Sequence, residues 1–228
     1  MNKDKLRWII ENPNDTIQRH LVRNEFFEIE ELEFLKSVIG IDNVVADIGA
    51  NIGNHAVYFS KFTTAKEIYV IEPIPKTYKM LLANLALNYC HNVNTDFIGV
   101  GLGNRECVGY PFMQYGVDNL GATALSPTPV TNLDESVLFD AVPVVTGDSL
   151  FENIHIDLCK IDTEGMELIV LEGLAKTIEN CRPRMFIEIM DINKAEFSKW
   201  LIDNKYKVSK VFDRYSKGLF ANYYILPG

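Results

Sequence analysis

Short apolar runs rich in β-branched residues alternate along the chain with stretches whose apolar positions recur at helical spacing. The runs predicted as strands are 44–48, 68–71, 93–100, 156–161 and 185–189. The helices predicted between and after them are 54–61, 76–88, 165–177 and 193–204. This alternation predicts an α/β fold, with an open, mostly parallel sheet and helices on both of its faces.

Three segments depart from the alternation. Residues 1–40 carry helical apolar spacing that ends at a glycine, which predicts an N-terminal helical segment ahead of a domain spanning 41–228. Residues 105–148 are rich in Gly, Pro, Thr and Ser and predict an excursion of hairpins and loops, a kind of segment that often serves function. The runs 208–212 and 220–226 flank a turn-forming stretch and predict a closing antiparallel hairpin.

Composition and charge narrow the class of protein. The 228 residues are 47% hydrophobic and 23% charged, as in one ordinary globular domain, and no apolar run approaches the roughly 20 residues of a membrane span. A net charge of −9 would repel phosphate backbones, so neither a membrane nor a nucleic-acid partner is predicted. Four widely separated cysteines without metal-ligand spacing, and an amino terminus without a signal-like apolar stretch, favour a cytoplasmic protein with reduced thiols.

Candidate chemistry begins directly after the first strand of the predicted sheet. The stretch from Asp47 to Gly53 reads Asp-Ile-Gly-Ala-Asn-Ile-Gly, and in open α/β folds ligands bind beyond the carboxyl ends of the strands. Glycine in such a loop lets the backbone come close to a ligand. Glu72, followed by Pro73, occupies the tip of the next strand, where a carboxylate can hold both hydroxyls of a ribose.

Two cofactor classes combine a ribose with a glycine loop. A dinucleotide fingerprint requires glycine two positions after Gly49, where this chain has Asn51, and Asp47 would face the pyrophosphate charge. S-adenosylmethionine carries an ammonium and a sulfonium and no phosphate. The pattern therefore favours S-adenosylmethionine, with a nicotinamide-dependent oxidoreductase as the alternative.

Four motifs resemble the FkbM-type family of class I methyltransferases in order and spacing. They are Asp-Ile-Gly-Ala-Asn-Ile-Gly-Asn-His (47–55), Ile-Glu-Pro (71–73), Gly-Asp-Ser-Leu (147–150) and Lys-Ile-Asp-Thr-Glu-Gly-Met-Glu (160–167). The resemblance implies a Rossmann-like class I fold, S-adenosylmethionine as cofactor, and methylation of a hydroxyl oxygen on a sugar or other natural product. It also implies adenine contacts at Gly99 and Val100. The chain departs from the family pattern at Gly147, where members often have a hydrophobic residue.

Acidic residues follow the strand predicted at 156–161. Asp162 and Glu164 lie just beyond it, and Glu167 follows one helical turn later, so the last two can share a helix face. Clustered carboxylates raise one another's pKa, which makes a catalytic base possible near neutral pH. The same groups could hold a divalent cation or bind sugar hydroxyls, or Asp162 could simply cap the following helix.

The predicted function is that of an S-adenosylmethionine-dependent O-methyltransferase acting on a saccharide or small natural product; a non-catalytic cofactor-binding domain is a second alternative. Lys160 either neutralises a carboxylate of the cofactor or acceptor, or pairs with a neighbouring acid. Glu188, at another strand tip, and Thr123, in the excursion, are predicted to meet the acceptor. The residues predicted to bind the cofactor are Asp47, Gly49, Ala50, Asn51, Gly53, Glu72, Pro73, Gly99 and Val100.

Overall fold

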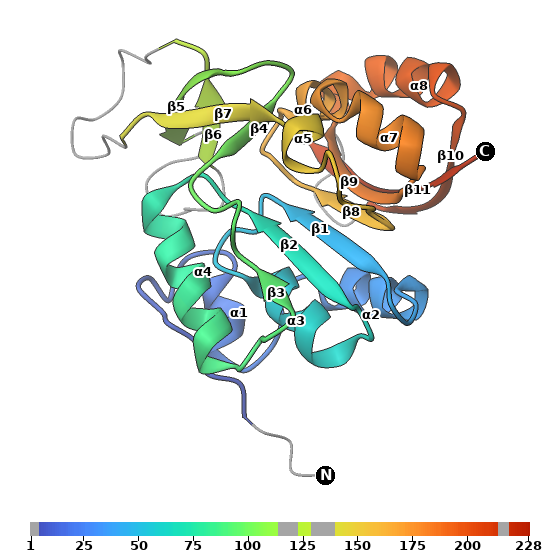
Figure 1. Ribbon diagram of the computed structural model, residues 1–228. Helices are drawn as coiled ribbons and strands as arrows, with labels where there is room; N and C mark the ends of the chain where they lie inside the picture. Colours follow the sequence, from blue (N-terminus) through green and yellow to red (C-terminus); the bar gives the residue numbers. More distant parts are fainter. Residues whose placement is uncertain (1–4, 114–122, 129–139, 214–218) are drawn as a thin grey trace.

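The computed structural model describes residues 5–113, 123–128, 140–213 and 219–228, and is built around a seven-stranded sheet (Figure 1). Its strands are β1 (Val44–Ile48), β2 (Glu67–Ile71), β3 (Val93–Asn94), β8 (Leu158–Ile161), β9 (Arg184–Met190), β10 (Tyr206–Phe212) and β11 (Phe220–Pro227). They lie in the order β3-β2-β1-β8-β9-β11-β10. Neighbours from β3 to β9 are parallel, whereas β11 is antiparallel to both β9 and β10. The predicted parallel sheet and its closing antiparallel hairpin are both confirmed.

Helices cover both faces of this sheet (Figure 1). They are α1 (Gln18–Val22), α2 (Ile29–Val38), α3 (Asn54–Phe62), α4 (Pro75–Leu87), α5 (Gly147–Leu150), α6 (Glu167–Gly173), α7 (Ala175–Cys181) and α8 (Lys194–Asp203). Val45 and Ile68 belong to a core shared with α2, α3 and α4, whereas Ala46 and Tyr69 face a second core shared with α6, α7 and α8. Because side chains alternate along a strand, each strand supplies both cores.

The N-terminal segment is less helical than its apolar spacing predicted. Only α1 and α2 form within the described part of residues 1–40, and residues 5–17 contain no helix. Buried asparagines of α4 hold this stretch: Asn88 exchanges two hydrogen bonds with the backbone of Arg7, and Asn84 Oδ1 accepts from the Ile9 N–H at 2.7 Å. Side-chain amides thus take the hydrogen bonds that a helix would otherwise supply.

Two further predicted elements are wrong in extent. The strand predicted at 93–100 forms a ladder with β2 at Val93 and Asn94 and a single further bridge between Ile98 and Glu72, before the chain turns at Gly99, which has a φ of +86°. The helix predicted at 165–177 is divided between α6 and α7, because Asp148 accepts hydrogen bonds from the backbone N–H groups of Lys176 and Thr177 and caps the start of α7.

A second, four-stranded sheet stands beside the carboxyl ends of the main strands (Figure 1). It consists of β4 (Gly101–Gly103), β7 (Val142–Thr146), β5 (Cys107–Met113) and β6 (Thr123–Ser126), in that order. The predicted excursion at 105–148 supplies three of these strands, and β4 joins them to the main sheet. Among the described residues, no helix has the length and hydropathy required to cross a membrane.

Candidate active site

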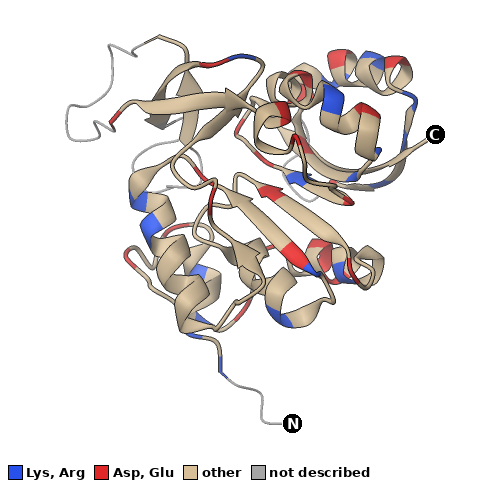
Figure 2. Ribbon diagram, in the orientation of Figure 1, with Lys and Arg blue, Asp and Glu red and all other residues tan. Residues whose placement is uncertain are grey.

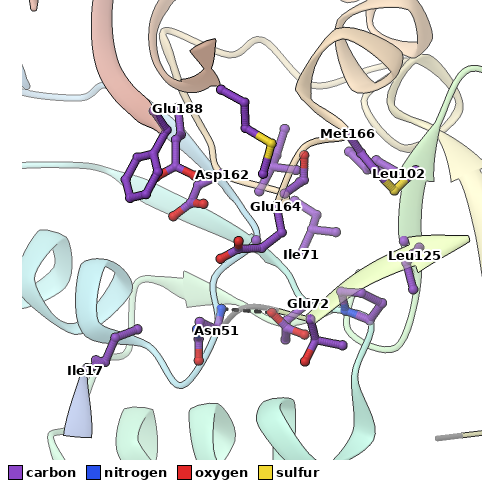
Figure 3. Close-up of a pocket in the computed structure, with 18 of the residues that line it drawn as sticks. Ile17, Asn51, Ile71, Glu72, Leu102, Leu125, Asp162, Glu164, Met166 and Glu188 are labelled. Carbon is purple, nitrogen blue, oxygen red and sulfur yellow. Dashed lines mark hydrogen bonds between the residues drawn. The ribbon is translucent and has the colours of Figure 1, made fainter. Parts of the chain in front are cut away.

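A cleft lies at the carboxyl ends of the parallel strands, where the fold leaves room for a ligand. Its walls come from the loop after β1, the tip of β2, strands β4 and β6, the loop after β8, the end of β9 and the start of β11. Residues from the N-terminal segment complete it. The space outside atoms within the cleft is about 1160 Å³, part of it open to solvent. Figure 3 shows the side chains that converge on it.

The loop after β1 takes its shape from two features of Gly49. Its φ is +80°, and a Cβ there would lie 1.8 Å from the carbonyl oxygen of Asp162. The neighbouring strand-end loop therefore requires glycine at this position, a reason that the sequence did not show. The N–H groups of Gly49 and Ala50 both donate to the Ile71 carbonyl, which ties the loop to the end of β2.

Glu72 lines the cleft from the tip of β2, as predicted for a ribose-binding carboxylate. One oxygen accepts the N–H of Asn51 at 2.9 Å, and the other accepts the N–H of Ile74 at 2.9 Å (Figure 3). Burial raises the pKa of Glu72 to about 7, although these two N–H donors lower it. Each carboxylate oxygen can accept more than one hydrogen bond, so the group keeps capacity for a ligand.

Asp47 and Lys160 lie behind the cleft rather than in it. Asp47 has no exposed surface, and neither residue is among the described residues that line the cleft. Lys160 Nζ donates to the Gly49 carbonyl at 2.8 Å and lies 3.4 Å from Asp47 Oδ1 and 3.2 Å from Asp162 Oδ2. Burial lowers the pKa of Lys160, but the carboxylates of Asp162 and Asp47 outweigh it and raise that pKa above its usual value. The cation therefore organises the loop, and Lys160 pairs with neighbouring acids, which is one of the two roles that the sequence left open.

Three predicted acidic residues converge on the opposite wall. Asp162, Glu164 and Glu188 line the cleft, and Figure 3 shows Asp162 and Glu188 together at one end, with Glu164 extending toward Asn51 and Glu72. Burial, followed by repulsion from Asp162 and Glu167, raises the pKa of Glu164 to about 9. Burial and the same neighbouring acids raise the pKa of Glu188 well above its ordinary value.

Glu167 does not reach the cleft, contrary to its predicted catalytic role. Its side chain is buried, and Oε1 accepts hydrogen bonds from the Thr163 N–H at 2.8 Å, the Thr163 hydroxyl at 3.2 Å and the Gly165 N–H at 3.0 Å. These bonds hold the loop that presents Glu164, whose φ is +56°. Glu167 is a positioning residue.

The remaining predicted residues divide between the cleft and its supports. Asn51, Pro73 and Thr123 line the cleft, whereas the predicted cofactor contacts Ala50, Gly53, Gly99 and Val100 are not among the described residues that line it. The chain turns before β4, so Gly101 and Leu102 take the places predicted for Gly99 and Val100. Gly121 and Ala122, which directly precede Thr123, fall outside the described residues.

The sequence missed the contribution of the N-terminal segment. Thr16, Ile17, Phe27 and Glu28 line the cleft, although residues 1–40 were predicted to form a helical segment ahead of the catalytic domain. Glu28 adopts a left-handed conformation with φ of +57° and accepts a hydrogen bond from Asn222 of β11 at 3.2 Å. A backbone turn of this kind leaves no periodic signal in the sequence.

All the ionisable side chains among the described residues that line the cleft are acidic. Figure 2 shows basic residues on outer helices such as α4, whereas no Lys, Arg or His occurs among the described residues that line the cleft. Its ionisable side chains are Glu28, Glu72, Asp162, Glu164 and Glu188. Within the described part of the chain, no group of three or more His, Cys, Asp and Glu side chains has an arrangement suited to a metal ion.

Comparisons with known proteins agree with this architecture. Residues 47–209 match the Methyltransferase FkbM domain. The chain is 25% identical over 171 residues to the hexuronic acid methyltransferase AglP of Haloferax volcanii, covering 68% of this chain and 63% of that protein. It is 24% identical over 184 residues to Methyltransferase 1 of Beauveria bassiana, covering 72% of each.

Solved structures show the same fold. A methyltransferase FkbM from Methylobacillus flagellatus KT aligns with a TM-score of 0.59 and 15% identity over 89% of this chain and 49% of that one. A methyltransferase from Streptococcus pneumoniae, solved in complex with S-adenosyl-L-methionine, aligns with a TM-score of 0.53 and 13% identity over 87% and 72% of the two chains. The chain therefore belongs to the FkbM methyltransferase family and has a class I methyltransferase fold, which confirms the predicted family and fold and argues against the oxidoreductase alternative.

Proposed function

We propose that this chain is an S-adenosylmethionine-dependent O-methyltransferase that acts on a hydroxyl of a saccharide or small natural product. The observation that carries the proposal is the position of Glu72 at the tip of β2, where it faces the cleft. The other ionisable side chains among the described lining residues are also acidic, and none is a cation. A dinucleotide would bring phosphate charges into this acidic cleft. An adenosyl sulfonium brings positive charge instead, and its ribose hydroxyls can donate to Glu72.

The residues of the cleft fit this cofactor in three parts. Glu72 would accept hydrogen bonds from the ribose, and the loop at Gly49 and Asn51 would lie along the amino-acid end. Pro73 and Leu102 offer apolar surface for the adenine ring of the cofactor. The bound cofactor supplies an electrophilic methyl group on sulfur. Lys160, held by Asp47, keeps the loop in place through the Gly49 carbonyl.

Glu164 is the proposed catalytic base. It extends into the cleft beside Asp162, and its pKa near 9 lies well above that of an ordinary carboxyl, so its ionised form is a stronger base than usual (Figure 3). In the proposed step the acceptor hydroxyl would give its proton to Glu164 as its oxygen bonds to the methyl carbon, and the methyl–sulfur bond would break to leave S-adenosylhomocysteine. Glu167 positions the backbone on which Glu164 is carried.

Two further considerations support a small acceptor. The curated relative from Haloferax volcanii is named for a hexuronic acid, which favours the saccharide class for this chain, although the chain spans only 63% of that relative's length. The acidic cleft would repel a phosphate backbone, which opposes a nucleic-acid acceptor.

Isothermal titration with S-adenosylhomocysteine tests the cofactor assignment. We expect the wild type to bind, Glu72→Ala to weaken binding by roughly tenfold or more, and Glu152→Ala, which removes an exposed carboxylate, to leave it unchanged. Absence of binding by the wild type, or equal binding by Glu72→Ala, would contradict the proposal. Transfer of a labelled methyl group from S-adenosylmethionine to a panel of glycosides tests turnover, which should require Glu164 and fall at least a hundredfold in Glu164→Gln.

A further inference from the structure

The acceptor end of the cleft carries more acidic side chains than the cofactor explains. Glu72 is occupied by the ribose in the proposed complex, which leaves Glu28, Asp162, Glu164 and Glu188 around the remaining space. The nearest buried cation, Lys160, is already engaged by the Gly49 carbonyl and by two carboxylates. An adenosyl sulfonium with its amino-acid group adds one net positive charge, so an excess of carboxylates remains.

Glu188 is a cleft-lining carboxylate for which the described residues provide no hydrogen bond or ion pair. Only 8% of its surface is exposed, it lines the cleft, and no hydrogen bond or ion pair joins its side chain to any described residue. A buried polar group without a partner destabilises a fold, so such groups are rare outside functional sites. Figure 3 places Glu188 at the Asp162 end of the cleft.

Its neighbour Glu28, in contrast, has polar partners within the protein. Asn222, which pairs with Glu188 across β9 and β11, donates to Glu28 Oε1, and His55 Nε2 lies 3.5 Å from Glu28 Oε2. Burial lowers the pKa of His55 well below its ordinary value, so this imidazole is neutral and supplies no positive charge. The described part of the chain thus provides polar partners for Glu28 and none for the Glu188 side chain.

We propose that the acceptor is a cationic, amine-bearing saccharide whose ammonium is bound by Glu188, beside the proposed base Glu164. This inference rests on the proposed function and narrows its substrate class. An ammonium provides three donors and one positive charge, which matches an unpartnered carboxylate beside further acids. A neutral sugar would supply donors without the charge, and a uronate or sugar phosphate would add repulsion to a site that holds no counter-cation among its described lining residues.

Matched glycosides separate these three classes. We would titrate the methyl glycosides of glucosamine, glucose and glucuronic acid into the full chain, saturated with S-adenosylhomocysteine, at low ionic strength. The glucosaminide should bind at least tenfold more tightly than the glucoside, and the glucuronide should bind weakest. Added salt should reduce the preference for the amine, because part of it is electrostatic.

Glu188→Gln tests the residue itself. The variant should reduce the preference for amine over hydroxyl to threefold or less while the affinity for S-adenosylhomocysteine is unchanged, and Glu179→Gln, on α7, should keep the full preference. Equal binding of glucosaminide and glucoside, tighter binding of the glucuronide, no binding by any glycoside, or an undiminished preference in Glu188→Gln would each overturn the inference. Failure of the wild type to bind S-adenosylhomocysteine would instead count against the proposed function, and the glycoside titrations of the unloaded chain would still report on the amine preference.

Discussion

The pH dependence of cofactor binding is the most direct quantitative consequence of the site. Burial raises the pKa of Glu72 to about 7, so the carboxyl is half protonated at neutral pH in the free protein. Ribose hydroxyls donate hydrogen bonds, and an ionised carboxylate accepts them better than a carboxylic acid does. Binding therefore favours the ionised form, and affinity for S-adenosylhomocysteine should fall as pH falls through 7.

The magnitude follows from the ionised fraction. With a pKa near 7, about one molecule in eleven is ionised at pH 6 and about ten in eleven at pH 8. The affinity should therefore fall about tenfold between pH 8 and pH 6, equivalent to about 1.4 kcal/mol of binding free energy. Binding lowers the pKa of Glu72, and below that lowered pKa the loss of affinity should reach a plateau.

Isothermal titration at pH 6, 7 and 8 and constant ionic strength measures this slope. Glu72→Gln provides the control, because it removes the titration while other ionisable groups contribute equally to both proteins. The variant will bind less tightly at every pH, since its amide nitrogen faces one of the N–H groups of Asn51 and Ile74 that the carboxylate accepts. The assignment of Glu72 would be refuted by the same pH slope in both proteins, or by affinity that increases as the wild type is acidified.

Other variants address stability. Gly49→Ala places a Cβ 1.8 Å from the Asp162 carbonyl at a φ of +80°, so chemical unfolding should show a loss of about 3 kcal/mol or more; a loss under about 1 kcal/mol would contradict the close approach. Glu167→Ala removes three hydrogen bonds and should lower the free energy of unfolding by about 2–4 kcal/mol. Glu167→Gln keeps the accepting oxygen, so its free energy of unfolding should stay within about 1 kcal/mol of wild type and its turnover should be retained. Loss of turnover in a stable Gln variant would instead indicate a catalytic role for Glu167. The folded-state pKa of Glu188 is raised above its ordinary value of 4.5, so wild-type stability falls as pH rises above that value. Glu188→Gln should therefore raise the melting temperature by roughly 2 °C or more at pH 8 and by less at pH 5. No gain at pH 8 would show that the Glu188 carboxyl already has hydrogen-bond partners in the folded protein. Asn84→Ala should cost about 2 kcal/mol and speed limited proteolysis of the N-terminal segment, and unchanged cleavage would show that this segment is held by other contacts.

Sequence reasoning succeeded where a local pattern and a tertiary role coincide. Glu72, Asp162, Glu164 and Glu188 were assigned to strand tips, and all four line the cleft, because the carboxyl ends of parallel strands meet at one edge of a sheet. Their position follows from the topology, and the topology follows from the alternation of strands and helices.

Polar residues of the same motifs lie at different depths, which the sequence does not show. Asp47, Lys160 and Glu167 are polar, lie in the same motifs and are not among the described residues that line the cleft. Only the packed structure shows that Asp47 and Lys160 pair behind the loop, and that Glu167 turns back to the N–H groups of Thr163 and Gly165. The direction of a side chain at a loop depends on neighbours that are distant in sequence.

The sequence by itself therefore determined the sheet, its closing hairpin, the family and the edge at which the chemistry lies, because these depend on periodicity and on short motifs. The tertiary structure decided which acids face the cleft and which support it. It also decided that the N-terminal segment supplies Glu28 to the site, since a left-handed turn and contacts between residues 28 and 222 leave no trace in any local pattern. The physical reason is that burial and the choice of hydrogen-bond partners depend on packing between distant segments, whereas secondary structure depends largely on residues that are neighbours in the sequence.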